Sequence, residues 1–216
     1  DLQEVVDEIV AAGGKAVANT DNISTWAGAS NLVNQAVETF GQLDAVVNNA
    51  GILRDGFVAG LEEDQWDSVI QVHLKGHFAV LRHAAEYWKA QSKAGDPVNA
   101  AVINTASASG TFMPNAGQSN YGAAKAGIAA ITEVAAMELE RYGVRVNAIA
   151  PTTVMTESRQ QLLADPEKRA AALARIPSRR FATPEEIAAA VVYLASPGAA
   201  SVTGHTLPVD GGLTAI

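Results

Sequence analysis

The sequence lacks cysteine, long apolar runs and the features of a targeting signal. Without cysteine, the 216 residues can form neither disulfides nor thiolate metal sites, and we predict no metal site. No stretch reaches the ~18 consecutive apolar residues that a membrane span requires. The first residues, DLQEVVDEIV, are acidic and amphipathic, unlike a signal peptide. From these absences we expect a cytoplasmic protein that does not contact a membrane.

An excess of basic residues is also absent. The formal net charge is −8, the isoelectric point is near 4.9, and no basic stripe occurs. Nucleic acid is therefore not expected as a partner. The 48% hydrophobic and 18% charged residues suit a globular protein with buried strands. The length is sufficient for one core, so we predict a single domain over residues 1–216.

Amphipathic stretches alternate with short apolar runs along the chain. The stretches with helical spacing of apolar residues cover residues 1–12, 25–40, 62–89, 119–142 and 184–194. The apolar runs that indicate strands cover residues 15–21, 43–47, 100–104, 144–150 and 206–210. Thr183-Pro184-Glu185-Glu186 has the pattern of a capping box with proline at the first helical position. This alternation predicts an α/β fold of three layers, α/β/α, with a parallel sheet between helices.

The residues that could carry chemistry gather in NTASASGTFMPNAGQSNYGAAKAG, residues 104–127. Tyr121 and Lys125 are one helical turn apart on the same face, and Ser107 follows the strand that ends at Asn104. A phenol has an ordinary pKa of ~10, and a neighbouring ammonium lowers that pKa toward the working pH. Tyr121 could then exchange a proton with a carbonyl or alcohol oxygen while Ser107 hydrogen-bonds the same oxygen.

Such a trio still needs a hydride donor, which no side chain supplies, so a nicotinamide cofactor is implied. The pattern Tyr-x-x-x-Lys is weak by itself, because a lone helical tyrosine is more often a half-buried packing residue. The surroundings of the trio therefore decide between these two interpretations.

Two further motifs surround the trio. Asn48-Asn49-Ala50-Gly51 directly follows the buried strand 43–47, and Val209-Asp210-Gly211-Gly212 ends the last strand. Together with the trio they make nearly the whole chain resemble the short-chain dehydrogenase/reductase family. The segments NNAGILRD and 180–212 resemble 3-oxoacyl-(acyl-carrier-protein) reductases. By contrast, QVHLKGHF and NTASASG resemble the (3R)-hydroxyacyl-CoA dehydrogenase domain of peroxisomal multifunctional enzymes.

The resemblance implies a Rossmann-like doubly wound sheet and an NAD- or NADP-dependent interconversion of a secondary alcohol and a ketone. The leading substrate class is a 3-oxoacyl or 3-hydroxyacyl thioester of coenzyme A or acyl carrier protein. A steroid, sugar or small ketone is the alternative, as is a nucleotide-sensing homologue without turnover. A Ser-His-Asp hydrolase is disfavoured because no G-x-S-x-G surrounds Ser107. The family likeness also implies a homotetramer or homodimer, with helices 62–89 and 119–142 pairing across one axis.

The resemblance assigns roles to individual residues. Tyr121 would be the general acid/base, Ser107 would hold the substrate oxygen, and Lys125 would lower the tyrosine pKa and bind the nicotinamide ribose. The remaining cofactor contacts would involve Asn48, Ala50 and Gly51 beside the adenosine, Asp21 near the adenine, and Pro151 and Thr156 at the nicotinamide carboxamide.

The sequence departs from the family pattern at three places. His73 stands where the family usually has an asparagine that takes part in a proton relay. A histidine can relay protons, but a packed structural histidine is an equal alternative. The segment TTVMT after Pro151 lacks the usual glycine, and Met113-Pro114 lengthens the loop between Ser107 and the tyrosine by one residue. Ser109 is a rival for the role of Ser107, which the resemblance favours.

The family's glycine-rich TGxxxGxG loop, which follows the first strand and binds the pyrophosphate, does not occur in the sequence. In the family's sheet order, 3-2-1-4-5-6-7, the first two strands would therefore be missing. We expect that the sequence is part of a longer protein and that residues 45–47 lie on an exposed apolar edge. The residue that selects NAD or NADP would lie in the missing part, so both cofactors remain open.

Overall fold

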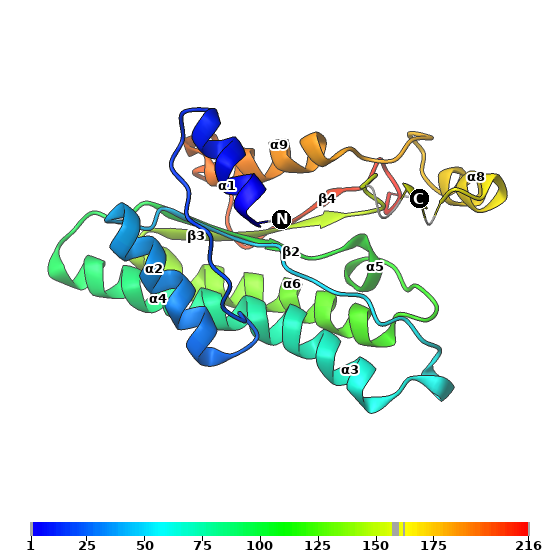
Figure 1. Ribbon diagram of the computed structural model, residues 1–216, viewed down its shortest axis with the longest axis horizontal. Coiled ribbons are helices and arrows are strands. Elements are labelled where there is room, and N and C mark those ends of the chain that lie inside the picture. The colour runs from blue at the N-terminus through cyan, green and yellow to red at the C-terminus, as the bar shows by residue number, and fades with distance from the viewer. Residues whose placement is uncertain (1, 157–159, 162, 216) are drawn as a thin grey trace.

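The computed structural model describes residues 2–156, 160–161 and 163–215. Its centre is a four-stranded sheet in the order β1-β2-β3-β4, and every neighbouring pair is parallel. The strands are β1 (Ala45–Asn48), β2 (Ala100–Thr105), β3 (Val144–Pro151) and β4 (Thr206–Val209). Helices cover both faces of this sheet (Figure 1). The predicted α/β class with a Rossmann-like parallel sheet is confirmed.

Three long helices pack on one face of the sheet and one on the other. The first group is α2 (Trp26–Phe40), α4 (Gly76–Ala94) and α6 (Ser119–Leu139), and the opposite face carries α9 (Pro184–Ala195). The shorter helices are α1 (Leu2–Ala11), α3 (Glu63–Val69), α5 (Ala108–Thr111) and α8 (Pro166–Ala174). The 3₁₀ turns are η1 (Val58–Gly60), η3 (Glu140–Tyr142) and η4 (Pro197–Ala199), and η2 (Ile70–Lys75) is a π-helix. Within the described ranges, no helix combines the length and apolarity needed to cross a bilayer.

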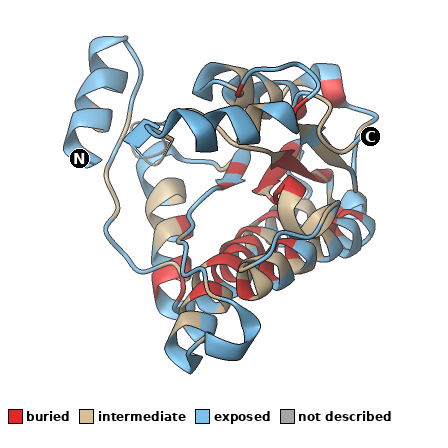
Figure 2. Ribbon diagram, turned by 90° about the vertical axis from the view of Figure 1, so that its right-hand side faces the viewer, coloured by how far each residue is buried: buried red, intermediate tan, exposed pale blue. Residues whose placement is uncertain are grey.

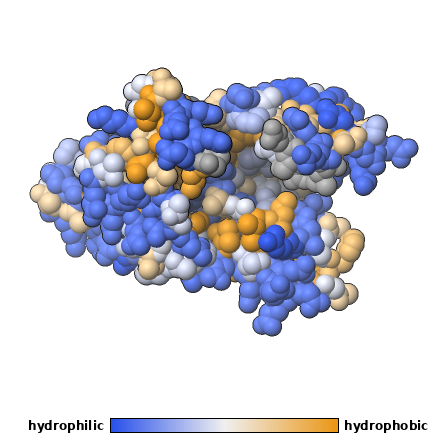
Figure 3. All heavy atoms as spheres, in the orientation of Figure 1, coloured by the Kyte–Doolittle hydropathy of each residue, from blue (hydrophilic) through white to orange (hydrophobic). Residues whose placement is uncertain are grey.

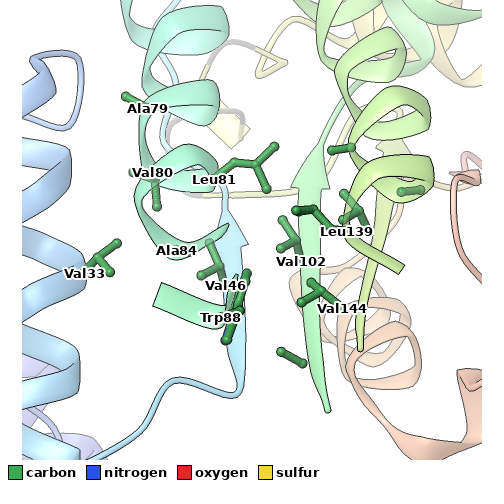
Figure 4. Packing of buried hydrophobic residues seen from close by; sticks show 14 of the residues in the cluster. Val33, Val46, Ala79, Val80, Leu81, Ala84, Trp88, Val102, Leu139 and Val144 are labelled. Atoms are coloured by element: carbon green, nitrogen blue, oxygen red, sulfur yellow. The ribbon is translucent and has the colours of Figure 1, made fainter. Parts of the chain in front are cut away.

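The larger core lies between the sheet and the helices of the first group (Figure 4). Val33 of α2 and Trp88 of α4 enter it together with Val46 of β1 and Val102 of β2. The Trp88 indole is buried, and its Nε1 donates to the Leu43 carbonyl oxygen at 2.7 Å, so its polar atom is satisfied. The first four residues of β2 are apolar and buried on both faces, as expected for a central parallel strand, and the polar Asn104 and Thr105 stand at its end.

The register brings the carboxyl ends of the strands to one edge. Asn48 at the end of β1 pairs with Asn104 of β2, and Thr105 of β2 pairs with Ile149 of β3. The segments that follow β1, β2 and β3 therefore emerge side by side. Ligands of open parallel sheets bind outside this edge.

The expected strand 15–21 is wrong. Residues 14–22 are extended but form no ladder, because no described strand lies beside them to supply hydrogen-bond partners. The expected exposed edge is confirmed, since Val47 of β1 is 49% exposed. None of the residues of α1 is buried, and Figure 2 shows this helix apart from the rest of the protein. Figure 3 shows hydrophobic residues gathered on the surface there, in agreement with the exposed Leu2 and Val5.

The single helix predicted over residues 62–89 is divided in three. It begins with α3, continues as the π-helix η2 and ends as α4 at Ala94, where Gly95 adopts φ 89°. A π-helix adds a residue to a turn, which local periodicity does not reveal. The predicted helices near 119–142 and 184–194 are confirmed as α6 with η3 and as α9. Thr183 and Glu186 form the predicted capping box.

Candidate active site

A cavity of about 550 Å³ opens at the carboxyl edge of the sheet. Its volume falls within the range typical of small-molecule sites. The residues that line it include Asn49, Gly51, Ile52, His73, Thr105, Ser107, Ser109, Gln118, Tyr121, Lys125, Thr152, Thr153, Arg175 and Leu213. The structure thus brings together Ser107, Tyr121, Lys125 and His73, which the sequence had singled out for chemistry.

Tyr121 and Lys125 lie one turn apart near the start of α6, as their spacing predicted. The Lys125 side chain is 2% exposed, and its Nζ donates to the Thr105 carbonyl oxygen at 2.5 Å. That nitrogen lies 5.5 Å from the centroid of the Tyr121 ring. Burial lowers the pKa of Lys125 to about 8. At neutral pH the lysine is therefore still a cation, held against the phenol ring by the end of β2.

Asn120, which was not predicted from the sequence, positions this part of α6. Its fully buried amide accepts from the Tyr121 backbone N–H at 2.7 Å. The amide also donates to the carbonyl oxygens of Arg54 at 2.8 Å and Gln65 at 3.1 Å. The residue before the tyrosine thereby ties the helix to two other segments. An asparagine near a helix start is common as a cap, so the sequence contained no distinguishing signal.

Ser107 lies at the N-cap of the short helix α5. Its Oγ accepts from the Ser109 backbone N–H at 3.2 Å, and the side chain is buried in the cavity wall. The rival Ser109 also lines the cavity, but its hydroxyl donates to Gln118 Oε1 at 2.9 Å. Ser107 donates no hydrogen bond to any residue the structure describes, so its hydrogen is available to a ligand.

The His73 imidazole packs edge-on against the Tyr121 ring, with centroids 5.2 Å apart. Its Nε2 lies 3.0 Å from the Ile52 nitrogen and 2.7 Å from the Ile52 oxygen. Its Nδ1 is buried and finds no hydrogen-bond partner among the described residues. Burial, and secondarily the Lys125 charge, lower the pKa of His73 to about 4, so the ring is neutral at pH 7.

Gly51 makes room for this histidine. A Cβ added at position 51 would lie 2.3 Å from His73 Cε1, closer than two carbon atoms can approach. The glycine of the NNAG motif therefore allows the backbone to run directly over the imidazole. The family resemblance assigns Gly51 to the cofactor alone.

A buried polar chain lies beneath the cavity. The Asn48 amide donates to Asn104 Oδ1 at 2.9 Å, and the Asn104 amide donates to Thr132 Oγ1 at 2.9 Å. The chain joins β1, β2 and α6, and all three side chains are buried. Fully satisfied networks of this kind make a core rigid.

The other predicted cofactor residues lie outside the cavity wall. Asn48 and Pro151 end β1 and β3, Ala50 follows the first of these strands, and Thr156 lies beyond the other. Asp21 is exposed, and its carboxylate accepts from the amides of Asn19 at 2.9 Å and Asn31 at 3.3 Å. Roles for these residues stay predictions. Further cavity residues that were not predicted from the sequence are Asn49, Thr105, Gln118, Thr152, Thr153 and Arg175.

The cavity is suited to an anionic ligand that carries hydroxyl and amide groups. Its described wall contains two cations, Lys125 and Arg175, and no Asp or Glu, although the chain as a whole has a net charge of −8. Hydroxyls and amides, from residues such as Thr105 and Asn49, supply neutral donors and acceptors. The groups around Lys125 fit the nicotinamide and ribose end of a dinucleotide. In the part of the chain that the structure describes, no three His, Asp or Glu side chains could hold a metal ion.

The chain is similar to known proteins over nearly its whole length. Residues 1–214 match the family described as Enoyl-(Acyl carrier protein) reductase. The chain is 43% identical to hydroxyacyl-CoA dehydrogenase ChsB1 of Mycobacterium tuberculosis, over 98% of the chain and 66% of that protein. It is 38% identical to the 3-oxoacyl-[acyl-carrier-protein] reductase FabG of Thermotoga maritima, over 98% of the chain and 82% of that protein. The structure of a short chain dehydrogenase from Mycobacterium avium superposes with a TM-score of 0.81 at 48% identity. The match covers 97% of this chain and 66% of that protein. The chain therefore spans slightly less than two thirds of the first relative's length.

Proposed function

The chain belongs to the short-chain dehydrogenase/reductase family of oxidoreductases, and from this membership we propose that it interconverts a secondary alcohol and a ketone with NAD or NADP. The observation that supports this most strongly is the presence of Ser107, Tyr121 and Lys125 in one cavity, with the buried ammonium beside the phenol ring. Nothing in the fold alone requires all three residues. A nucleotide-sensing homologue without turnover would have no need of them.

The cofactor would be held by Asn49, Gly51, Thr105 and Lys125, with Thr152 and Thr153 at the end of β3. When bound, the nicotinamide supplies or accepts the hydride, chemistry that side chains cannot provide. The residues predicted from the family likeness, including Asn48, Ala50, Pro151, Thr156 and Asp21, lie outside the cavity and are proposed as outer contacts of the same ligand.

The proton would be carried by Tyr121. Its hydroxyl gives a proton to the substrate oxygen in reduction and takes one from it in oxidation. The Lys125 charge favours the phenolate form, because opposite charges attract and a buried ammonium is only weakly screened by water. The Ser107 hydroxyl donates a hydrogen bond to the same substrate oxygen, which stabilises charge that develops there.

His73 is proposed as a neutral relay in this proton transfer. A neutral imidazole can accept a proton at one nitrogen while it donates from the other. The ring already contacts Tyr121 and leaves Nδ1 without a partner among the described residues. The alternative of a packing role rests on the same contact and on the fit of the ring against Gly51.

For the substrate we propose a 3-oxoacyl or 3-hydroxyacyl thioester of coenzyme A or acyl carrier protein. Support comes from the names of two relatives, a hydroxyacyl-CoA dehydrogenase and a 3-oxoacyl-[acyl-carrier-protein] reductase. A steroid, sugar or small ketone could be processed by the same trio and is the alternative.

For the assembly we propose a homotetramer or homodimer in which α4 and α6 pair with the same helices of a second copy. A groove of about 490 Å³ between these helices is lined by apolar residues that include Phe78, Ile131 and Val134. Met137 of α6 is 84% exposed. Light scattering of the purified protein tests this directly.

The proposed reaction is tested by following NADH and NADPH absorbance with acetoacetyl-CoA and a panel of ketones. Tyr121→Phe should lower kcat roughly 100-fold to 10,000-fold, because the proton donor is lost. Cofactor binding should persist, because the ring stays in place. Tyr193→Phe, the same change on the exposed surface of α9, is the control. Full turnover by Tyr121→Phe would remove the basis of the proposal.

A further inference from the structure

The cavity contains a cation that the proposed reaction does not use. Of the two cations in its wall, Lys125 is bonded to the end of β2 beside Tyr121. The other, Arg175, follows α8 and belongs to a basic segment, although the chain as a whole has a net negative charge. Residues 166–180 contain five of the chain's fifteen basic residues and one of its 23 acidic residues.

The Arg175 side chain differs from the other described arginines of this segment. Arg180 forms two bonds of 2.7 Å with the Glu186 carboxylate, and Arg179 donates to the Ala174 carbonyl oxygen at 2.9 Å. Arg169 lies over the Phe181 ring at 5.6 Å. Arg175 makes no side-chain hydrogen bond or ion pair with any residue that the structure describes. Its guanidinium therefore retains its donors for a ligand.

The backbone next to Arg175 is firmly anchored. Ile176 is buried, and the Ser178 N–H donates to the Gly211 carbonyl oxygen at 3.0 Å. A Cβ at Gly211 would lie 2.4 Å from Ser178 Oγ, so the two segments are in close contact. This packing against the turn after β4 fixes the backbone of the segment from which the exposed Arg175 side chain reaches the cavity wall. A fixed backbone lowers the entropic cost of binding, because only the side chain must be ordered when a ligand binds.

We propose that Arg175 binds an anionic group of the substrate, a carboxylate or a phosphate, while Tyr121 and Ser107 bind the reacting oxygen. The planar guanidinium can form two parallel hydrogen bonds with either anion. The described wall holds no Asp or Glu that would compete for it. This inference rests on the proposed function and narrows it, because a neutral ketone would leave Arg175 without a partner. A short keto acid supplies the carboxylate, and a coenzyme A thioester supplies the phosphates.

The test compares substrates that differ in charge, using the full-length gene product and its Arg175→Gln variant. The substrates are acetoacetyl-CoA, acetoacetate and the uncharged ethyl acetoacetate. We expect Arg175→Gln to lower kcat/KM for the anionic substrate roughly 10- to 100-fold, mainly through KM. The value for ethyl acetoacetate should change by less than about twofold, within the range of a surface substitution. Arg175→Lys should restore part of the difference, because it keeps the charge and loses the two-point geometry.

Lys168→Gln is the matched control, since it removes one charge from the exposed surface of α8 and does not touch the cavity. A loss confined to acetoacetate assigns the carboxylate, and a loss confined to acetoacetyl-CoA assigns the phosphates. Equal losses for the ester and the anions would overturn the proposal, as would weaker NAD(P)H binding without any dependence on substrate charge.

Calorimetric titration separates this inference from the proposed function. Wild type and Arg175→Gln are titrated with acetoacetate and acetoacetyl-CoA in the absence of turnover. If no substrate is reduced but an anion binds wild type and not Arg175→Gln, the reaction is wrong and the anion site stands. Equal anion affinity in the two proteins, or anion binding to neither, contradicts the site whatever the activity.

Discussion

The cavity is enclosed by two walls that are built in different ways. The wall formed by η2, β2 and α6 is part of the core, and its His73, Ser107 and Lys125 are all buried. The wall formed by the segments after β3, α8 and β4 consists of half-buried or exposed residues, including Thr152, Arg175 and Leu213. None of the residues of α8 is buried. The groups proposed to do chemistry are thus held by the core, whereas the groups proposed to choose the substrate lie on the surface.

This difference has a physical basis. A proton donor and its activating cation must keep a geometry to within fractions of an ångström, which close packing and satisfied hydrogen bonds provide. Asn120 and the side-chain hydrogen bonds that link Asn48, Asn104 and Thr132 supply such bonds on the core side. A surface segment can change its side chains without cost to the core, so one reaction can serve many substrates. Substitutions on the two walls should therefore act on different quantities.

The largest effect is expected for Lys125→Met on the core side. Loss of the cation beside Tyr121 should lower kcat roughly 100-fold or more. The same variant should be more stable at pH 7. Folding lowers the pKa of Lys125 from 10.5 to about 8, so burial of its charged form lowers the free energy of unfolding by about 3 kcal/mol. The lost bond to the Thr105 carbonyl offsets part of this gain. Activity assays and denaturant titrations measure both changes, with the exposed Lys168→Met as control.

The pH dependence of this stability has a definite sign. Because the folded pKa of Lys125 lies below the unfolded one, the folded state binds fewer protons between pH 8 and 10.5. Lys125 therefore does not lower the free energy of unfolding above pH 10.5, where it is neutral in both states. Its destabilising effect grows as the pH drops from 10.5 to 8. Wild type should gain stability relative to Lys125→Met as the pH rises across this window. Parallel curves for the two proteins would show that Lys125 is not buried as an ion.

An intermediate effect is expected for Gly51→Ala. The new methyl group would overlap the His73 ring, and overpacking of this kind costs about 1–3 kcal/mol of unfolding free energy. Gly60→Ala is the control, since a Cβ there meets no described atom within 4 Å. In a protein that already carries His73→Ala, Gly51→Ala should lower the free energy of unfolding much less than in wild type. If Gly51→Ala alone is neutral, the imidazole is free to move and the core wall is less rigid than its packing indicates.

The smallest effect on the whole protein is expected for Asp165→Ala at the start of α8. The Asp165 carboxylate caps this helix by accepting from the backbone N–H of Glu167 at 2.9 Å. Its loss should weaken α8 by about 1 kcal/mol. Because α8 buries none of its residues, the result should be faster amide exchange over residues 166–174 with unchanged global unfolding. Thr183→Ala, the equivalent change on the packed helix α9, should lower global stability instead. Equal losses of global stability in Asp165→Ala and Thr183→Ala would contradict the distinction between the two walls.

The two walls also differ in how far they could be predicted. The spacing of Tyr121 and Lys125 places them on one helix face wherever that helix packs, so the core of the site was predictable. The surrounding contacts were not, because each joins residues far apart in the chain. Lys125 donates to the Thr105 carbonyl, Asn120 donates to distant carbonyls, and Gly51 packs against His73. Arg175 had no signal at all, since one arginine in a basic segment looks like the next until the fold places one of them in a cavity.

The sequence by itself determined the alternation of helices and strands, the capping box at Thr183 and the order of the motifs, because each depends on residues within a turn or two of one another. Only the tertiary structure decided that residues 15–21 form no strand, that the helix around His73 contains a π-turn, and which polar atoms meet at the cavity. A strand needs a neighbour, and a buried polar group needs a partner. Both are supplied by distant parts of the chain, which local patterns do not encode.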